Sequence, residues 1–144
     1  MTETTFAPDA TCTRGQSVTF LHRALKGTAS GSANFTDVKS DAFYADAINW
    51  AVANNVTNGT SNTTFSPNAD CTRAEIVTFL YRALGTAPTT VNGFTDVTAD
   101  AFYADAVAWA VESGVTNGTS ASTFSPNNGC TRAQIVTFLY RTMK

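Results

Sequence analysis

The 144-residue sequence contains few charged side chains and no long apolar run. Charged residues make up 14% of it, lysine is nearly absent, and the formal net charge is −2. A chain with this balance has no basic surface, so we expect it to bind neither nucleic acid nor an anionic membrane. It also lacks a run of about 18 apolar residues and a charged-then-apolar leader, so we expect no membrane insertion and no signal peptide.

Histidine and cysteine are scarce as well. The only histidine is His22, and the three cysteines, Cys12, Cys71 and Cys130, cannot all pair within the chain. Without companion histidines a zinc site is not expected, so we interpret the cysteines as small buried hydrophobic residues. The sequence has no Ser-His-Asp set, no phosphate-binding glycine loop and no calcium-loop spacing, so we expect no catalytic residue, no cofactor and no metal.

What the sequence does contain is a repeat of 59 residues. The segment T-F-S-P-N-A-D-C-T-R-A-E-I-V-T-F-L-Y-R-A-L recurs at this shift in both directions without a gap, which makes Arg14, Arg73 and Arg132 equivalent. The front half of the unit, which begins F-T-D-V, occurs only twice. We therefore divide the chain into a back half, two full units and two linkers: 1–26, 35–84, 94–144, 26–34 and 85–93.

Each back half predicts one helix. Thr72 and Glu75 have the spacing of a capping box, which places the start of the helix at Thr72 and Arg73 at its first position. The apolar residues that follow form one broad stripe at helical spacing. The front half predicts a second helix, about 41–54, with Asp41 as its cap. The chain should therefore form five helices and no sheet, an all-α fold.

The position of the arginine needs an explanation, because a cation at a helix N-terminus is unfavourable by roughly 0.3–1 kcal/mol. Arg73 projects onto the apolar side of its helix, in line with Leu80. We therefore expect a crevice at the end of a packed bundle, in which the guanidinium meets an anion. An internal salt bridge is the alternative, and its candidate partners are Asp37, Asp41, Asp46, Asp96, Asp100 and Asp105.

Two further pairs of residues are candidates for a binding site. Trp50 and Trp109 could stack on a sugar ring, although helical periodicity places them at the edge of the core. Gly59 and Gly118 supply the positive-φ position of the turn V-T-N-G-T, so we include them as candidate ligand-binding residues.

The ordered motifs F-x-D-V, Y-A-D-A-I-x-W-A, V-T-N-G-T, T-F-S-P-N and T-R-A-E resemble the S-layer homology (SLH) module over nearly the whole chain. The resemblance implies a pseudo-threefold arrangement of tandem helical repeats, in which the three T-R helices form a central bundle. It also implies an extracellular protein of a Gram-positive cell wall or S-layer, held non-covalently to pyruvylated secondary cell-wall polysaccharide. The asparagine- and threonine-rich composition agrees with such a location.

The resemblance assigns the acidic sugar to the T-R arginine, here Arg14, Arg73 and Arg132. The motif departs from T-R-A-E at Gln16 and Gln134, which still close a capping box. A helix N-terminus and a guanidinium together could receive a carboxylate.

The missing front half limits the number of complete grooves to two in these 144 residues. Grooves built with the following front half would use Arg14 and Arg73, and grooves built with the preceding one would use Arg73 and Arg132. We favour the preceding front half, because Arg14 is followed by Gly15 instead of alanine. The alternative function is a self-assembling scaffold, in which another chain fills the position of the missing front half.

Overall fold

The computed structural model describes residues 10–27 and 34–143. Within these ranges the chain forms five helices: α1 (Arg14–Ala24), α2 (Ala45–Ala53), α3 (Arg73–Leu84), α4 (Ala104–Glu112) and α5 (Arg132–Met143). The described residues contain isolated β-bridges but no strand, so the all-α prediction is confirmed for them. None of these five helices is long and apolar enough to cross a membrane. The start of the predicted first back half, residues 1–9, and most of the first linker, residues 28–33, lie outside the described residues.

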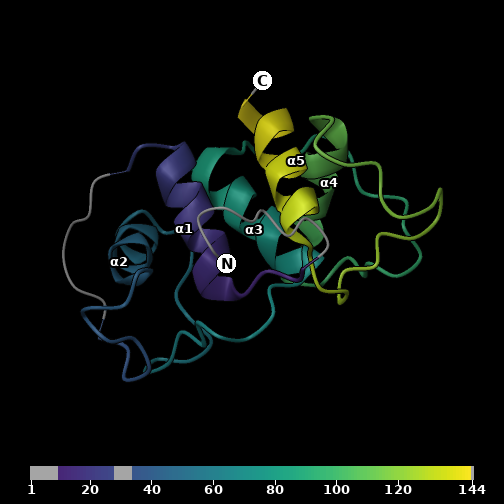
Figure 1. Cartoon of the computed structure of the whole chain (residues 1–144). Helices are drawn as coiled ribbons and strands as arrows, with labels where there is room; N and C mark the ends of the chain where they lie inside the picture. Colours follow the sequence, from purple (N-terminus) through teal and green to yellow (C-terminus); the bar gives the residue numbers. More distant parts are fainter. Residues whose placement is uncertain (1–9, 28–33, 144) are drawn as a thin grey trace.

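The three helices that begin with T-R pack together at the centre of the molecule (Figure 1). Each of α1, α3 and α5 contacts the other two. The front-half helices lie outside this bundle, α2 against α1 and α4 against α3. Helices α1 and α3 therefore each pack against the helix of the front half that follows them in the sequence.

A closed ring of backbone hydrogen bonds joins the three repeats just before these helices begin. The N–H of Cys12 donates to the carbonyl of Cys130 (2.9 Å), Cys130 donates to Cys71 (2.8 Å), and Cys71 donates to Cys12 (2.8 Å). Each repeat thus donates one bond and accepts one. The pseudo-threefold arrangement is our interpretation of this ring.

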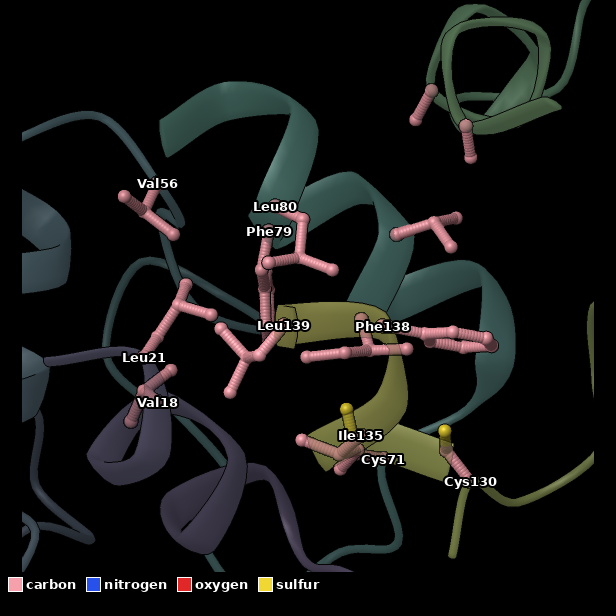
Figure 2. Close-up of a cluster of buried hydrophobic side chains, with 14 of the residues drawn as sticks. Val18, Leu21, Val56, Cys71, Phe79, Leu80, Cys130, Ile135, Phe138 and Leu139 are labelled. Atoms are coloured by element: carbon pink, nitrogen blue, oxygen red, sulfur yellow. The ribbon is translucent and has the colours of Figure 1, made fainter. Parts of the chain in front are cut away.

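The core lies where the three central helices meet (Figure 2). Leu21 of α1, Leu80 of α3 and Ile135 of α5 are fully buried there, together with all three cysteines. Truncation of a buried leucine or isoleucine to alanine costs about 2–5 kcal/mol. The apolar stripe predicted for each T-R helix therefore forms the junction between the repeats.

The helix starts differ between the two halves of the unit. The back-half helices begin as predicted, because Thr13 and Thr72 close complete capping boxes with Gln16 and Glu75. The front-half helix begins at Ala45, with Tyr44 as an N-cap that makes no side-chain capping bond. The predicted start at Asp41 is wrong, because two consecutive i to i+3 turns, closed by the N–H groups of Ala42 and Ala45, precede the helix.

The burial of the cysteines generates a testable prediction. Burial raises the pKa of all three thiols, to about 12 for Cys130, so the reactive thiolate is rare in the folded protein. We expect a thiol-reactive dye to label the native protein far more slowly than the same protein in guanidinium chloride. If one thiol reacted with the dye as fast in the native protein as in guanidinium chloride, the burial of all three cysteines between the repeats would be contradicted.

Candidate ligand-binding site

The three T-R arginines are buried, as their position on the apolar side predicts. The exposed fractions of Arg14, Arg73 and Arg132 are 4%, 4% and 2%. Buried arginines at the ends of packed helices need acceptors for their nitrogens, because a buried donor without a partner is destabilising by about 1–3 kcal/mol. The partners that each guanidinium finds therefore decide what the site can bind.

The backbone N–H groups at the helix starts already have partners. The N–H of Arg73 donates to Asn128, and the N–H of Ala74 donates to Pro126, both at backbone carbonyls. The N–H of Glu75 donates to the hydroxyl of Thr72. The prediction that the helix N-terminus itself receives a carboxylate is therefore wrong for α3, and the arginine side chain is the donor that remains.

Arg73 is held in place by the turn that follows α4. Its Nε donates to the carbonyl of Phe124 at 2.9 Å. Its guanidinium carbon lies 4.8 Å from the ring centroid of Phe124 and 5.6 Å from that of Phe138. Its Nη2 is buried and has no hydrogen-bond partner among residues 10–27 and 34–143. Burial lowers the pKa of Arg73, and the nearby Cys130 and Asp96 only partly offset this effect.

A cleft of about 320 Å³ opens beside this guanidinium. Its volume is at the lower end of the roughly 300–1,000 Å³ typical of small-molecule sites. Arg73 comes from α3, and the other walls come from the V-T-N-G-T turn and from one face of α5. The lining residues are Arg73, Thr116, Asn117, Gly118, Ala133, Gln134, Thr137, Phe138 and Arg141. They include two arginines and no acidic residue, so the cleft is positively charged in a chain of negative net charge.

The aspartate of F-x-D-V holds the turn that carries the Phe124 carbonyl. Asp96 accepts hydrogen bonds from the N–H groups of Phe124 (2.9 Å) and Ser125 (2.8 Å). Ser125 lies at a positive φ of 60°, a conformation that a residue other than glycine adopts only when its surroundings hold it there. Asp96 therefore fixes the turn whose Phe124 carbonyl binds Arg73. Asp37 does the same for Phe65 and Ser66 in the other full unit.

The internal salt bridge that the described residues do form is one that the sequence analysis missed. Arg14 pairs with Glu75, not with any of the predicted aspartates. Glu75 acts through both oxygens, because Oε1 accepts the capping bond from the N–H of Thr72 while Oε2 binds Nη1 of Arg14. The shift of 59 residues makes Gln134 the counterpart of Glu75 beside Arg73. The signal available in the sequence was that this motif position alternates between glutamine and glutamate.

Arg132 has the fewest partners of the three arginines among the described residues. Its Nε and Nη2 are buried without a hydrogen-bond partner there, and its guanidinium carbon lies 5.4 Å from the ring centroid of Phe20. Its backbone N–H donates to Ala10, at the first described position of the chain.

The other candidate residues lie in two different environments. Trp50 and Trp109 are only 7% and 6% exposed and pack against His22 and Tyr81, so they belong to the core and do not line the Arg73 cleft. A sugar-stacking role for them stays a prediction. Gly118 lines the cleft at a φ of 92°, and Gly59 has the same conformation, with a φ of 90°.

The contacts also decide which front half each arginine meets. Nε of Arg14 donates to the carbonyl of Phe65 at 3.0 Å, and Nε of Arg73 to that of Phe124. Both turns belong to the unit that follows the arginine. The V-T-N-G-T wall of the Arg73 cleft also belongs to the front half that follows Arg73, so our preference for the preceding front half is wrong. The reason is that α1 packs on α2 and α3 packs on α4.

Comparison with known proteins identifies the family. The family model described as S-layer homology domain matches residues 34–77 and 93–136, which is more than half of the chain. The chain belongs to the S-layer homology family. SLH domains are non-catalytic domains that bind cell-wall polysaccharide and anchor surface proteins to the cell wall. Membership therefore places this chain outside the cell, at a cell wall or S-layer.

Relatives of this SLH chain include surface proteins and enzymes. The surface-layer 125 kDa protein of Lysinibacillus sphaericus is 35% identical over 96% of this chain and 12% of its own length. A cell surface protein of Thermoanaerobacter kivui is 33% identical over 76% of this chain and 15% of its own length. An amylopullulanase of Thermoanaerobacterium thermosulfurigenes is 30% identical over 74% of this chain and 6% of its own length. The SLH chain thus spans a small part of each of these relatives.

The turn glycine of the cleft can be tested against a neighbouring glycine. A Cβ at Gly118 would lie 2.6 Å from the Phe94 ring and 2.7 Å from the carbonyl oxygen of Thr123, whereas a Cβ at Gly114 would meet nothing within 4 Å. Both have a positive φ, so alanine at either position costs about 1–2 kcal/mol of backbone strain. We expect Gly118→Ala to lower the free energy of unfolding more than Gly114→Ala in denaturant titrations. Equal losses of unfolding free energy in the two variants would show that the turn at Gly118 accommodates the Cβ without additional strain.

The role of Asp96 predicts a dependence of stability on pH. Loss of some solvation acts to raise the pKa of the exposed Asp96, but the hydrogen bonds from Phe124 and Ser125 and the Arg73 charge lower it below the ordinary 3.8. The stabilisation is therefore complete above the ordinary pKa and is lost as the pH falls through the lower, folded-state pKa. We expect Asp96→Asn to lower the melting temperature at neutral pH and to flatten its decline in acid. Asp100→Asn, at an exposed position in the next turn, is the control, and an equal effect there would contradict this role.

Proposed function

We propose that this SLH chain is a non-catalytic anchor that binds acidic, pyruvylated secondary cell-wall polysaccharide through the cleft at Arg73. The observation that carries the proposal is Nη2 of Arg73, which has no partner in the described part of the chain and is buried at the wall of a cleft lined by two arginines and no acidic residue. The carboxylate of a pyruvyl ketal would supply the acceptor that Nη2 lacks. A charge-assisted hydrogen bond in so buried a place is stronger than one at an exposed arginine.

The flanking rings support the same ligand. Phe124 and Phe138 lie beside the guanidinium, so its hydrogen-bonding edge is the part left for a ligand. Arg141 provides a second cation, and its Nη1 is held by the carbonyl of Val115 at 3.2 Å. Asn117 and Thr137 add polar groups at the same cleft, of the kind that recognises sugar hydroxyls. The neutral part of the glycan would contact these groups, while the carboxylate contacts Arg73.

The proposal keeps the division of the chain into a back half, 1–26, and two full modules, 35–84 and 94–144. The two full modules supply the turns that Arg14 and Arg73 contact. Arg132 meets no front half among the described residues, so we propose a smaller contribution from it to binding by these 144 residues.

Binding to purified wall polysaccharide, before and after removal of its pyruvyl groups, tests the proposal. We expect the intact polysaccharide to bind and the depyruvylated polysaccharide to bind much more weakly. Arg73→Ala should weaken binding to the intact polymer by about 1.5–3 kcal/mol, the effect of losing a charged hydrogen bond. Arg132→Ala is the matched control, because it removes an equally buried arginine from the same helix position.

Three outcomes would contradict the proposal: equal binding to both polymers, unchanged binding by Arg73→Ala, or an equal loss for Arg73→Ala and Arg132→Ala. Thermal melts accompany each assay so that unfolded variants are recognised. Light scattering over a range of concentrations tests the scaffold alternative. That alternative predicts an oligomer that does not bind the wall polysaccharide.

A further inference from the structure

One face of α5 is exposed, although the same face is buried on the two equivalent helices. Val18 of α1 and Val77 of α3 are both 0% exposed, whereas their counterpart on α5, Val136, is 41% exposed. The threonine that follows each valine shows the same contrast, because it is buried on α1 and α3 and exposed on α5. Five residues at helical spacing form this surface, the open face of α5: Ala133, Val136, Thr137, Tyr140 and Met143.

The front-half helices account for the difference. Helix α2 packs on α1 and α4 packs on α3, whereas α5 contacts neither α2 nor α4 in the described part of the chain. Trp50 of α2 packs against His22 of α1, with ring centroids 5.4 Å apart. Trp109 of α4 packs in the same way against Tyr81 of α3, at 5.7 Å. Their counterpart on α5 is Tyr140, which is 66% exposed, so α5 presents the residue types that hold a front-half helix on α3.

Backbone hydrogen bonds indicate which front half belongs at this face. Each T-R arginine donates its backbone N–H to the back half of another unit: Arg14 to Ala69, Arg73 to Asn128 and Arg132 to Ala10. The front halves of the units that contain Ala69 and Asn128 pack on α1 and α3, the helices that these bonds reach. The unit that contains Ala10 is the one whose front half does not occur in these 144 residues. By the same rule, a front half of that unit would cover α5.

We propose that the open face of α5 is a docking surface for the front half of an SLH module supplied by another polypeptide. A second copy of this chain offers no such segment, because α2 and α4 already pack on α1 and α3, and moving either would uncover the helix that it leaves. The partner is recognised by a helix of the pattern A-D-A-x-x-W-A. Its alanines allow two helices to approach closely, and its tryptophan packs on Tyr140. This surface goes beyond the anchor function and does not depend on it.

A peptide with the sequence of residues 94–120, the front half of the last module, is the probe. We expect isothermal titration calorimetry to show one peptide bound per chain. Val136→Asp should weaken this binding roughly tenfold or more, because it places an unpaired charge in an apolar contact. Val111→Asp is the matched control, since Val111 is 38% exposed on α4 and lies outside the open face, and it should bind the peptide as the native chain does. A peptide that carries Trp109→Ala should bind more weakly than the native peptide.

A fused chain removes the requirement that a free peptide fold as it binds. Residues 35–59 placed directly ahead of Met1 reproduce the spacing of a full unit, because Met1 lies 59 residues before Thr60. We expect this fusion to unfold at a higher guanidinium chloride concentration than the native chain and to bind no added peptide. Val136→Asp should remove most of the gain in stability. That pattern in the fused chain supports the docking surface even where the free peptide binds weakly.

The proposal would be overturned if the peptide failed to bind and the fused front half failed to stabilise the chain. Equal weakening of peptide binding by Val136→Asp and Val111→Asp would also overturn it, because the peptide would then lie elsewhere. A dimer of the native chain in light scattering that Val136→Asp dissociates would assign the open face to a second copy instead. These results leave the proposed function untouched, since its readout is binding of the polysaccharide.

Discussion

The bond from a buried arginine Nε to a turn carbonyl is the interaction on which fold and site both depend. Arg14 and Arg73 use it to tie their helices to the turns at Phe65 and Phe124. The adjacent backbone N–H groups bind carbonyls of the same turns, so each turn joins its neighbouring repeat through several bonds. The unfavourable placement of a cation at a helix start is thereby offset by bonds and ring contacts, and the guanidinium is held rigidly for a ligand.

The turn that receives this bond is held in place by the front half of the unit. The aspartate of F-x-D-V binds two consecutive N–H groups of the turn and allows a serine to take a positive φ. Motifs far apart in the unit therefore act on one arginine: F-x-D-V orients the carbonyl, F-S-P supplies it, and V-T-N-G-T forms a cleft wall. A change at the aspartate would alter the cleft without touching any lining residue.

Near-identical repeats do not guarantee identical sites. Glu75 and Gln134 perform the same structural task at the helix start, so folding tolerates either residue. Oε2 of Glu75 also binds the arginine of the neighbouring repeat, whereas Nη2 of Arg73 has no hydrogen-bond partner among the described residues.

The sequence by itself determined the repeat, the family, the all-α class, the capped starts of the T-R helices and the burial of their arginines. These follow from local spacing and helical periodicity, which a single chain displays directly. Only the tertiary structure decided the partners of those arginines, because the following front half, the Phe124 carbonyl and the Glu75 carboxylate reach them from other repeats. The start of the front-half helix at Ala45 was likewise set by preceding turns and not by a capping side chain. Long-range pairing of side chains depends on how the helices pack, and the spacing of residues within one motif does not determine that packing.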